Sequence, residues 1–93
     1  MKIVGFIWLE EIVEKLEAKH QVTPDEVEQV FSNRPGVKRV HRGRFRGEDV
    51  YRALGQTDAG RHLVIFFIHK LSQEILILSA RDMDEKERKS YAK

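Results

Sequence analysis

The sequence predicts a single α+β domain in which helices pack against an antiparallel sheet. The chain has 93 residues, a length typical of one domain. Two segments in its first third show apolar residues at helical spacing, and its second half holds four short runs rich in β-branched and aromatic residues. Because short turns separate those runs, we expect an antiparallel meander with the helices gathered against it. The predicted order of elements is β-α-α-β-β-β-β-α.

The first third of the chain is expected to form one strand and two helices. Residues 2–8, KIVGFIW, are typical of a strand. From Leu9 the apolar residues recur at i, i+3, i+4 and i+7, which predicts a helix whose other face is acidic. A second helix begins at TPDE (23–26), where the threonine can cap, the proline suits the first turn and the glutamate completes a capping box. It ends at NRPG (33–36).

The second half is expected to form four strands and a last helix. The predicted strands are residues 37–41, 49–55, 62–68 and 74–80. The last two are continuous apolar runs, so we expect central strands that are covered on both faces. Asp84, followed three residues later by Glu87, predicts the start of a helix that extends to about Ala92.

Composition restricts the class of protein. Hydrophobic residues make up 41% and charged residues 34%, as in an ordinary soluble globular protein. The chain has no cysteine, which excludes disulfides, thiolate metal sites and cysteine nucleophiles. The longest apolar run, residues 63–68, is too short to span a membrane. We interpret residues 1–15 as a structural strand and helix, not a signal peptide, and we infer a cytoplasmic protein without a membrane partner.

The net charge of +2 conceals a strongly basic segment. Residues 1–33 carry three basic and seven acidic residues, and residues 48–93 carry eight of each. Residues 34–47, RPGVKRVHRGRFRG, carry six basic residues and no acid. Such a block is expected of a surface that meets an anion.

Arg81 is a candidate phosphate-binding residue. It follows Ile75, Ile77 and Ser79 at a spacing of two, so we expect it on their face of the strand. The helix that follows begins with free N–H groups that favour an anion, and a guanidinium matches two phosphate oxygens. The alternative is an ion pair with a nearby acid, which is the more frequent role of such an arginine. The candidate acids are Asp84, Glu85 and Glu48.

Several other residues also allow two interpretations. Arg88 and Tyr91 lie three apart on the last helix and can face a ligand together, although spacing alone favours a packing role for Tyr91. His20 continues the apolar stripe of the first helix, as either a core residue or a proton-transfer group at a helix end. His62 and His69 bracket one strand on opposite faces, roughly 23 Å apart, so they cannot share a metal. No spacing of histidines and carboxylates predicts a metal site.

The loop HRGRFRG (41–47) is a candidate RNA-binding element. Arg42, Arg44 and Arg46 suit backbone phosphates, and Phe45 suits a stacked base. The alternative is a solvated hairpin tip with Phe45 folded onto the sheet.

Four segments together resemble the BrnT family, ribonuclease toxins of type II toxin–antitoxin systems within the RelE-like fold group. They are FIW (6–8), KHQVTPDEVEQVF (19–31), YRALGQTDAGRHLVIFF (51–67) and ILILSARDMDEKERKSY (75–91). The resemblance implies an endoribonuclease that needs no metal or other cofactor and cleaves RNA to stop translation. It also implies a cognate DNA-binding antitoxin, and contact with promoter DNA only through the toxin–antitoxin complex.

Matched motif by motif, the resemblance also implies catalytic positions. They are His20, Arg61, Arg81, Arg88 and Tyr91. As a hypothesis, Arg61 and Arg81 clamp the scissile phosphate with support from Arg88. His20 or Tyr91 would then transfer a proton. The sequence departs from the family pattern where the family often has aspartate, glycine and arginine, at Leu9, Gln21 and Gln56.

Two other classes of function fit the residues themselves. A non-catalytic nucleic-acid-binding module would use the basic segment electrostatically, and its binding would weaken steeply with salt. An interaction protein would use the same segment only to receive an acidic partner, without affinity for RNA.

Overall fold

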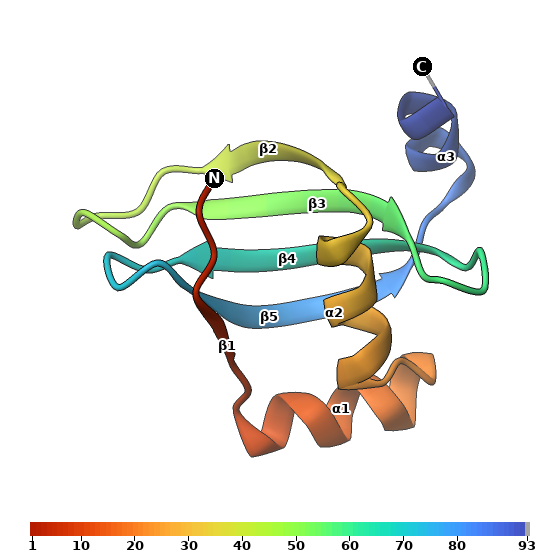
Figure 1. Ribbon diagram of the computed structural model, residues 1–93, viewed down its shortest axis with the longest axis horizontal. Helices are drawn as coiled ribbons and strands as arrows, with labels where there is room; N and C mark the ends of the chain where they lie inside the picture. Colours follow the sequence, from red (N-terminus) through yellow and green to blue (C-terminus); the bar gives the residue numbers. More distant parts are fainter. Residues whose placement is uncertain (93) are drawn as a thin grey trace.

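The computed structural model describes residues 1–92 and confirms the predicted order of elements (Figure 1). The helices are α1 (Glu10–His20), α2 (Pro24–Ser32) and α3 (Glu85–Ala92). The strands are β1 (Gly5–Ile7), β2 (Gly36–His41), β3 (Val50–Gln56), β4 (His62–His69) and β5 (Glu74–Asp82). The predicted α+β class is therefore confirmed.

The five strands form one sheet in the order β1-β5-β4-β3-β2. Strands β2 to β5 are the predicted antiparallel meander. Strand β1 instead pairs parallel to β5, with Gly5 opposite Glu74, so the sheet is mixed and not wholly antiparallel. After β1 the chain passes through α1 and α2 to the far edge of the sheet, and β5 returns to β1 in the same direction (Figure 1).

Two helices start with reciprocal side-chain caps, as the sequence predicts. The Glu26 N–H donates to Thr23 Oγ1 at 3.2 Å, and the Thr23 N–H donates to Glu26 Oε1 at 3.1 Å. At α3 the Glu87 N–H donates to Asp84 Oδ1 at 2.8 Å, and the Asp84 N–H donates to Glu87 Oε1 at 2.9 Å. Each cap satisfies two backbone donors that the first turn of a helix leaves unpaired.

The main core lies between the sheet and the helices α1 and α2. Its fully buried members are Leu16, Val22, Val27, Val30, Ala53, Leu63, Ile65, Phe67, Ile75, Ile77 and Ala80. Phe67 meets the Phe31 ring of α2 edge-on at 5.1 Å and stacks on Tyr51 at 5.6 Å. Gly55 lets α2 approach β3, because a Cβ there would stand 2.8 Å from Val30 Cγ1. The helices cover the central strands on this face of the sheet, while all of β2 stays exposed.

The opposite face of the sheet is covered only at one end, by α3 (Figure 1). A small second cluster joins Leu54, Val64 and Met83, with Phe66 and Tyr91 packed against it. No residue of α3 is itself buried. The expectation that β4 and β5 are covered on both faces is therefore wrong for the part of this face away from α3, where Ile68 and Leu76 stay partly exposed. We call this side the α3 face and the other side the core face.

Candidate functional site

Arg81 lies on the α3 face because β5 contains a bulge. Opposite β4 the register passes from Phe66–Ser79 to Phe67–Ile77, so Leu78 is an extra residue. One extra residue inverts the alternation of side chains beyond it. The expectation that Arg81 shares a face with Ile75 and Ile77 is therefore wrong, whereas it does share the face of Ser79.

Arg81 forms a two-pronged ion pair with Glu87 at the first turn of α3. The Nη1–Oε1 distance is 2.8 Å and the Nη2–Oε2 distance is 3.0 Å. The hydrogen bond from Arg81 lowers the pKa of the Glu87 carboxyl, and the same bond raises the pKa of the guanidinium. An ion pair was the expected alternative, but the partner is Glu87 and not Asp84, Glu85 or Glu48.

Arg81 nevertheless keeps capacity to bind a further group. Its Nη1 also donates to the Asp82 carbonyl at 3.1 Å. Within residues 1–92, its Nε–H and one Nη2–H have no hydrogen-bond acceptor. The guanidinium carbon lies 5.9 Å from the centre of the Phe66 ring, so the arginine borders the partly exposed half of the α3 face.

Arg61 lies on the core face and holds three elements together. Its Nη1 and Nη2 donate to the carbonyls of Gln21 and His20, both at 2.7 Å, at the end of α1. Its Nε donates to Asp82 Oδ1 at 2.7 Å, and Nη2 donates to Asp82 Oδ2 at 3.2 Å. Nη1 also contacts the Glu26 carboxylate at 3.3 Å. All five N–H groups of the guanidinium therefore have protein acceptors.

The charges around Arg61 stabilise one another. Hydrogen bonds to Asp82 and then Glu26 raise the pKa of Arg61, and the bond from Arg61 lowers the pKa of Asp82. His20, the half-buried last residue of α1, contacts Arg61 through its backbone carbonyl. Asp82 is opposite Leu63 on the core face, whereas Arg81 is opposite Val64 on the α3 face. The structure thus places Arg61 and Arg81 on opposite faces and does not bring them together around one phosphate.

Arg88 and Tyr91 lie together in a pocket between α3 and the ends of β3 and β4. The pocket has a volume of about 780 Å³. Its lining residues are Gln56, His62, Met83, Glu85, Arg88, Lys89, Tyr91 and Ala92. The ring of Tyr91 meets that of His62 edge-on at 5.7 Å, and its hydroxyl donates to Gln56 Oε1 at 3.4 Å. We call it the α3 pocket.

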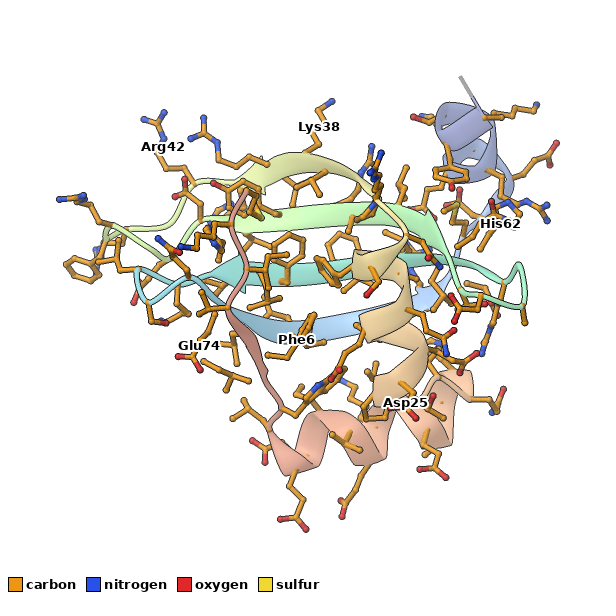
Figure 2. The ribbon with its side chains drawn as sticks, viewed as in Figure 1. Phe6, Asp25, Lys38, Arg42, His62 and Glu74 are labelled. Atoms are coloured by element: carbon orange, nitrogen blue, oxygen red, sulfur yellow. The ribbon has the colours of Figure 1, made fainter. Side chains whose placement is uncertain are left out.

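His62 and Gln56 are functional candidates that sequence reasoning missed. They face each other across the β3–β4 hairpin, in the last row of the sheet before the turn. The turn at 57–60 is recognisable in the sequence, and pairing back from it would have placed both side chains together on one face. Figure 2 shows His62 at the end of the sheet where α3 lies.

The predicted RNA-binding loop lies at the other end of the sheet from the α3 pocket, as the labels of Arg42 and His62 show (Figure 2). The side chains of Arg42, Arg44 and Arg46 are exposed. Phe45 is 66% exposed, so the alternative in which it folds onto the sheet is wrong.

Asp49 holds the base of this loop. It accepts the Gly43 N–H at 2.8 Å and an Arg39 N–H at 3.3 Å. The Gly43 N–H, followed by Arg39, lowers the pKa of the Asp49 carboxyl. Gly43 is required here because a Cβ would stand 2.4 Å from the Glu48 carbonyl oxygen.

No helix among residues 1–92 is long and apolar enough to cross a membrane. No group of three or more histidine, cysteine, aspartate or glutamate residues in the described part of the chain has the arrangement of a metal site.

Comparison with known proteins gives one family match. The family described as the ribonuclease toxin, BrnT, of type II toxin–antitoxin systems matches residues 8–87 of the chain. No curated protein matches the sequence significantly. The observed α+β fold is consistent with the RelE-like assignment of this family. Because the match covers most of its length, the chain belongs to the BrnT family of ribonuclease toxins.

Proposed function

We propose that this protein is a metal-independent endoribonuclease toxin that cleaves RNA to inhibit translation. The observation that supports this best is the grouping of His62, Arg88 and Tyr91 around the α3 pocket. These three side chains supply an acid–base group, a fixed positive charge and a phenol on one side of the sheet. Arg81 lies on the same face opposite Val64, two residues along β4 from His62.

Cleavage requires little from the protein because RNA carries its own nucleophile. The 2′-hydroxyl attacks the neighbouring phosphorus while the bond from phosphorus to the 5′-oxygen breaks. The products are a 2′,3′-cyclic phosphate and a 5′-hydroxyl. The protein must accept the 2′ proton, return a proton to the leaving oxygen and stabilise the charge that develops on the phosphate.

The side chains of the α3 pocket can divide these tasks. The imidazole of His62 accepts the 2′ proton, since an imidazole nitrogen can act as a general base. The phenol of Tyr91 donates a proton to the leaving oxygen. Arg88 stabilises the charged phosphate, as a guanidinium matches two of its oxygens. Gln56, which accepts the hydrogen bond of Tyr91, orients the phenol.

Under this proposal the remaining candidate residues do not contact the scissile phosphate. Arg81 fixes the first turn of α3 through Glu87 and presents its unused N–H groups to a neighbouring phosphate. Arg61 is a positioning residue, because all its donors bind protein atoms at the junction of α1, α2 and β5. His20 belongs to that junction and not to the α3 pocket.

The partners follow from the family and the charge distribution. The exposed loop of Arg42, Arg44, Phe45 and Arg46 binds the RNA backbone and stacks on a base. A cognate DNA-binding antitoxin neutralises the toxin, and promoter DNA is bound only by the complex of the two proteins. The site of action would be the cytoplasm, where RNA is translated.

The test is cleavage of RNA by the purified chain in the presence of a metal chelator. We expect cleavage that leaves 2′,3′-cyclic phosphate ends. Tyr91→Phe and Arg88→Ala should each slow it, by on the order of 10²-fold or more. Lys86→Ala is the matched control, because Lys86 is exposed on the same helix and does not line the pocket.

Two outcomes would contradict the proposal. Loss of cleavage on chelation would show that a metal takes part. Salt-sensitive RNA binding without cleavage, by a folded chain, would favour the non-catalytic binding module instead. Growth arrest of a bacterial culture on induction of the chain, relieved by Tyr91→Phe, would tie the chemistry to toxicity.

A further inference from the structure

Strand β2 is an open edge of the sheet. It pairs only with β3 and ends the strand order. All six of its residues are exposed, including Val37 at 40% and Val40 at 45%. The outer side of such a strand presents backbone N–H and C=O groups that can pair with another extended chain.

Pockets lie on both sides of this edge. On the α3 face a pocket of about 360 Å³ is lined by Gly36, Val37, Lys38, Arg52, Leu54, Ser90 and Tyr91. On the core face a pocket of about 340 Å³ is lined by Met1, Ile3, Phe31, Arg34, Pro35 and Val37. The first pocket contains Lys38 and Arg52, and the second is lined by apolar side chains together with Arg34. Gly36 and Val37 are consecutive, so the two pockets flank the same point of the strand on opposite faces.

We propose that β2 receives an extended segment of a partner protein in which acidic and apolar residues alternate. Side chains of an added strand would point alternately to the two faces, with a period that matches the two pockets. An acidic side chain would enter the pocket of Lys38 and Arg52, where Gly36 leaves room above the strand. The next side chain, an apolar one, would enter the pocket of Ile3, Phe31 and Pro35.

Charge identifies the kind of occupant. Residues 34–47 carry six basic side chains and no acid. Arg34, Lys38 and Arg52 form no ion pair with any carboxylate of residues 1–92. Figure 2 shows Lys38 projecting outward from β2. This charge opposes pairing with the β2 strand of a second copy and favours an acidic strand.

The same geometry connects docking with the α3 pocket. Tyr91 lines both that pocket and the basic pocket beside β2. A partner side chain bound next to Lys38 would therefore contact Tyr91 on the side away from the α3 pocket. The identity of the partner as the antitoxin, and the inhibition of cleavage by docking, both rest on the proposed function. The addition of a partner strand to β2 does not depend on the proposed function.

The experiment uses a fluorescent peptide of about six residues, the length of one strand, with alternating glutamate and leucine. We expect saturable binding to the wild-type chain and slower hydrogen exchange in residues 36–41. Lys38→Glu and Arg52→Glu should each weaken binding by on the order of 10-fold. Lys15→Glu is the control for charge, because Lys15 is exposed on α1 and lines neither pocket.

Backbone methylation of the peptide tests strand addition directly. A strand bonds its neighbour through alternate residues, so N-methylation of one set of alternate positions should abolish binding and methylation of the other set should be tolerated. The proposal would be overturned if N-methylation of either set of positions weakened binding equally. It would also be overturned if a peptide of the same composition, with all glutamates before all leucines, bound as well as the alternating one. RNA is absent from this measurement, so a failure here is distinguishable from a failure of the proposed nuclease activity.

Discussion

The Arg81 guanidinium lies against the Glu87 carboxylate with Nη1–Oε1 and Nη2–Oε2 distances of 2.8 and 3.0 Å. The pair joins the end of β5 to the first turn of α3, the element that forms one wall of the α3 pocket. Because α3 has no buried residue, this polar contact is a large part of what fixes its position.

The Arg81–Glu87 pair should make stability depend on pH in the acid range. The folded-state pKa of Glu87 is lowered, so the pair stabilises the fold fully above the unfolded pKa and loses its effect as pH falls through the folded pKa. Glu87→Gln should lower the free energy of unfolding by about 1 kcal/mol at neutral pH, a modest figure because Arg81 is partly exposed. Urea unfolding should show a smaller difference near pH 3.

The control for this prediction is Glu85→Gln, since Glu85 makes only an exposed pair with Lys89. An equal loss of stability at both pH values for Glu87→Gln would indicate that the cap of α3, and not the ion pair, is what the substitution removes.

Arg61 should prove to be structural. Arg61→Met leaves the carbonyls of His20 and Gln21 and two carboxylates without their donor, so we expect a loss of roughly 1–3 kcal/mol in chemical denaturation. Arg61→Lys should recover little, because an ammonium cannot reproduce the planar fork. If either variant keeps full stability and loses only RNA affinity, Arg61 contacts the phosphate directly.

His62 should be required for the chemical step of RNA cleavage. A general base accepts the 2′ proton as the hydroxyl attacks, so His62→Gln should lower the rate at saturating RNA by about 10²-fold or more, with little effect on the thermal midpoint. His69→Gln, at the opposite end of β4 and on the other face, is the matched control. An unchanged rate in His62→Gln would exclude His62 as the base.

The basic loop should act on affinity and not on chemistry. Replacing Arg42, Arg44 and Arg46 with glutamine should reduce the slope of log affinity against log salt by about 2, since each phosphate contact contributes ~0.7 on a single strand. The cleavage rate at saturating RNA should change little, because the loop lies at the opposite end of the sheet from His62 (Figure 2). A fall in that rate with unchanged affinity would contradict this division.

Gln56 offers a test by gain of function. Gln56 lines the α3 pocket and accepts the hydrogen bond of Tyr91. Gln56→Arg adds a cation, so we expect RNA to bind several-fold more tightly at low salt and the advantage to shrink as salt rises. Unchanged binding across salt concentrations would indicate that RNA does not enter this pocket.

Much of the fold could be predicted because its signals are local. The threonine cap, the adjoining proline and the apolar spacing of α2 lie within ten residues, and the structure confirms them. The meander follows from short turns for the same reason. The parallel pairing of β1 with β5 could not be predicted, because it joins residues about seventy positions apart and β1 has only three residues.

The candidate site was harder to predict than the fold. The grouping of Arg88 with Tyr91 follows from helical spacing, whereas their meeting with His62 depends on how α3 folds back over the sheet. The partners of Arg61 come from α1, α2 and β5, and no spacing in the sequence indicates them. Side-chain alternation misplaced Arg81 because it assumes an uninterrupted strand.

The extra residue Leu78 makes the pairing register of β5 a determinant of surface chemistry. If β5 kept Leu78 but paired with β4 without the bulge, Ser79 and Arg81 would turn toward the core face and Ala80 would turn outward. Every proposed catalytic residue would still be present in such a chain, yet Arg81 could no longer reach Glu87 on the α3 face. Deleting Leu78 would instead leave these three residues on their present faces, so in alignments of this family a one-residue gap at the bulge is harmless to Arg81, whereas a gap between Ser79 and Arg81 is not.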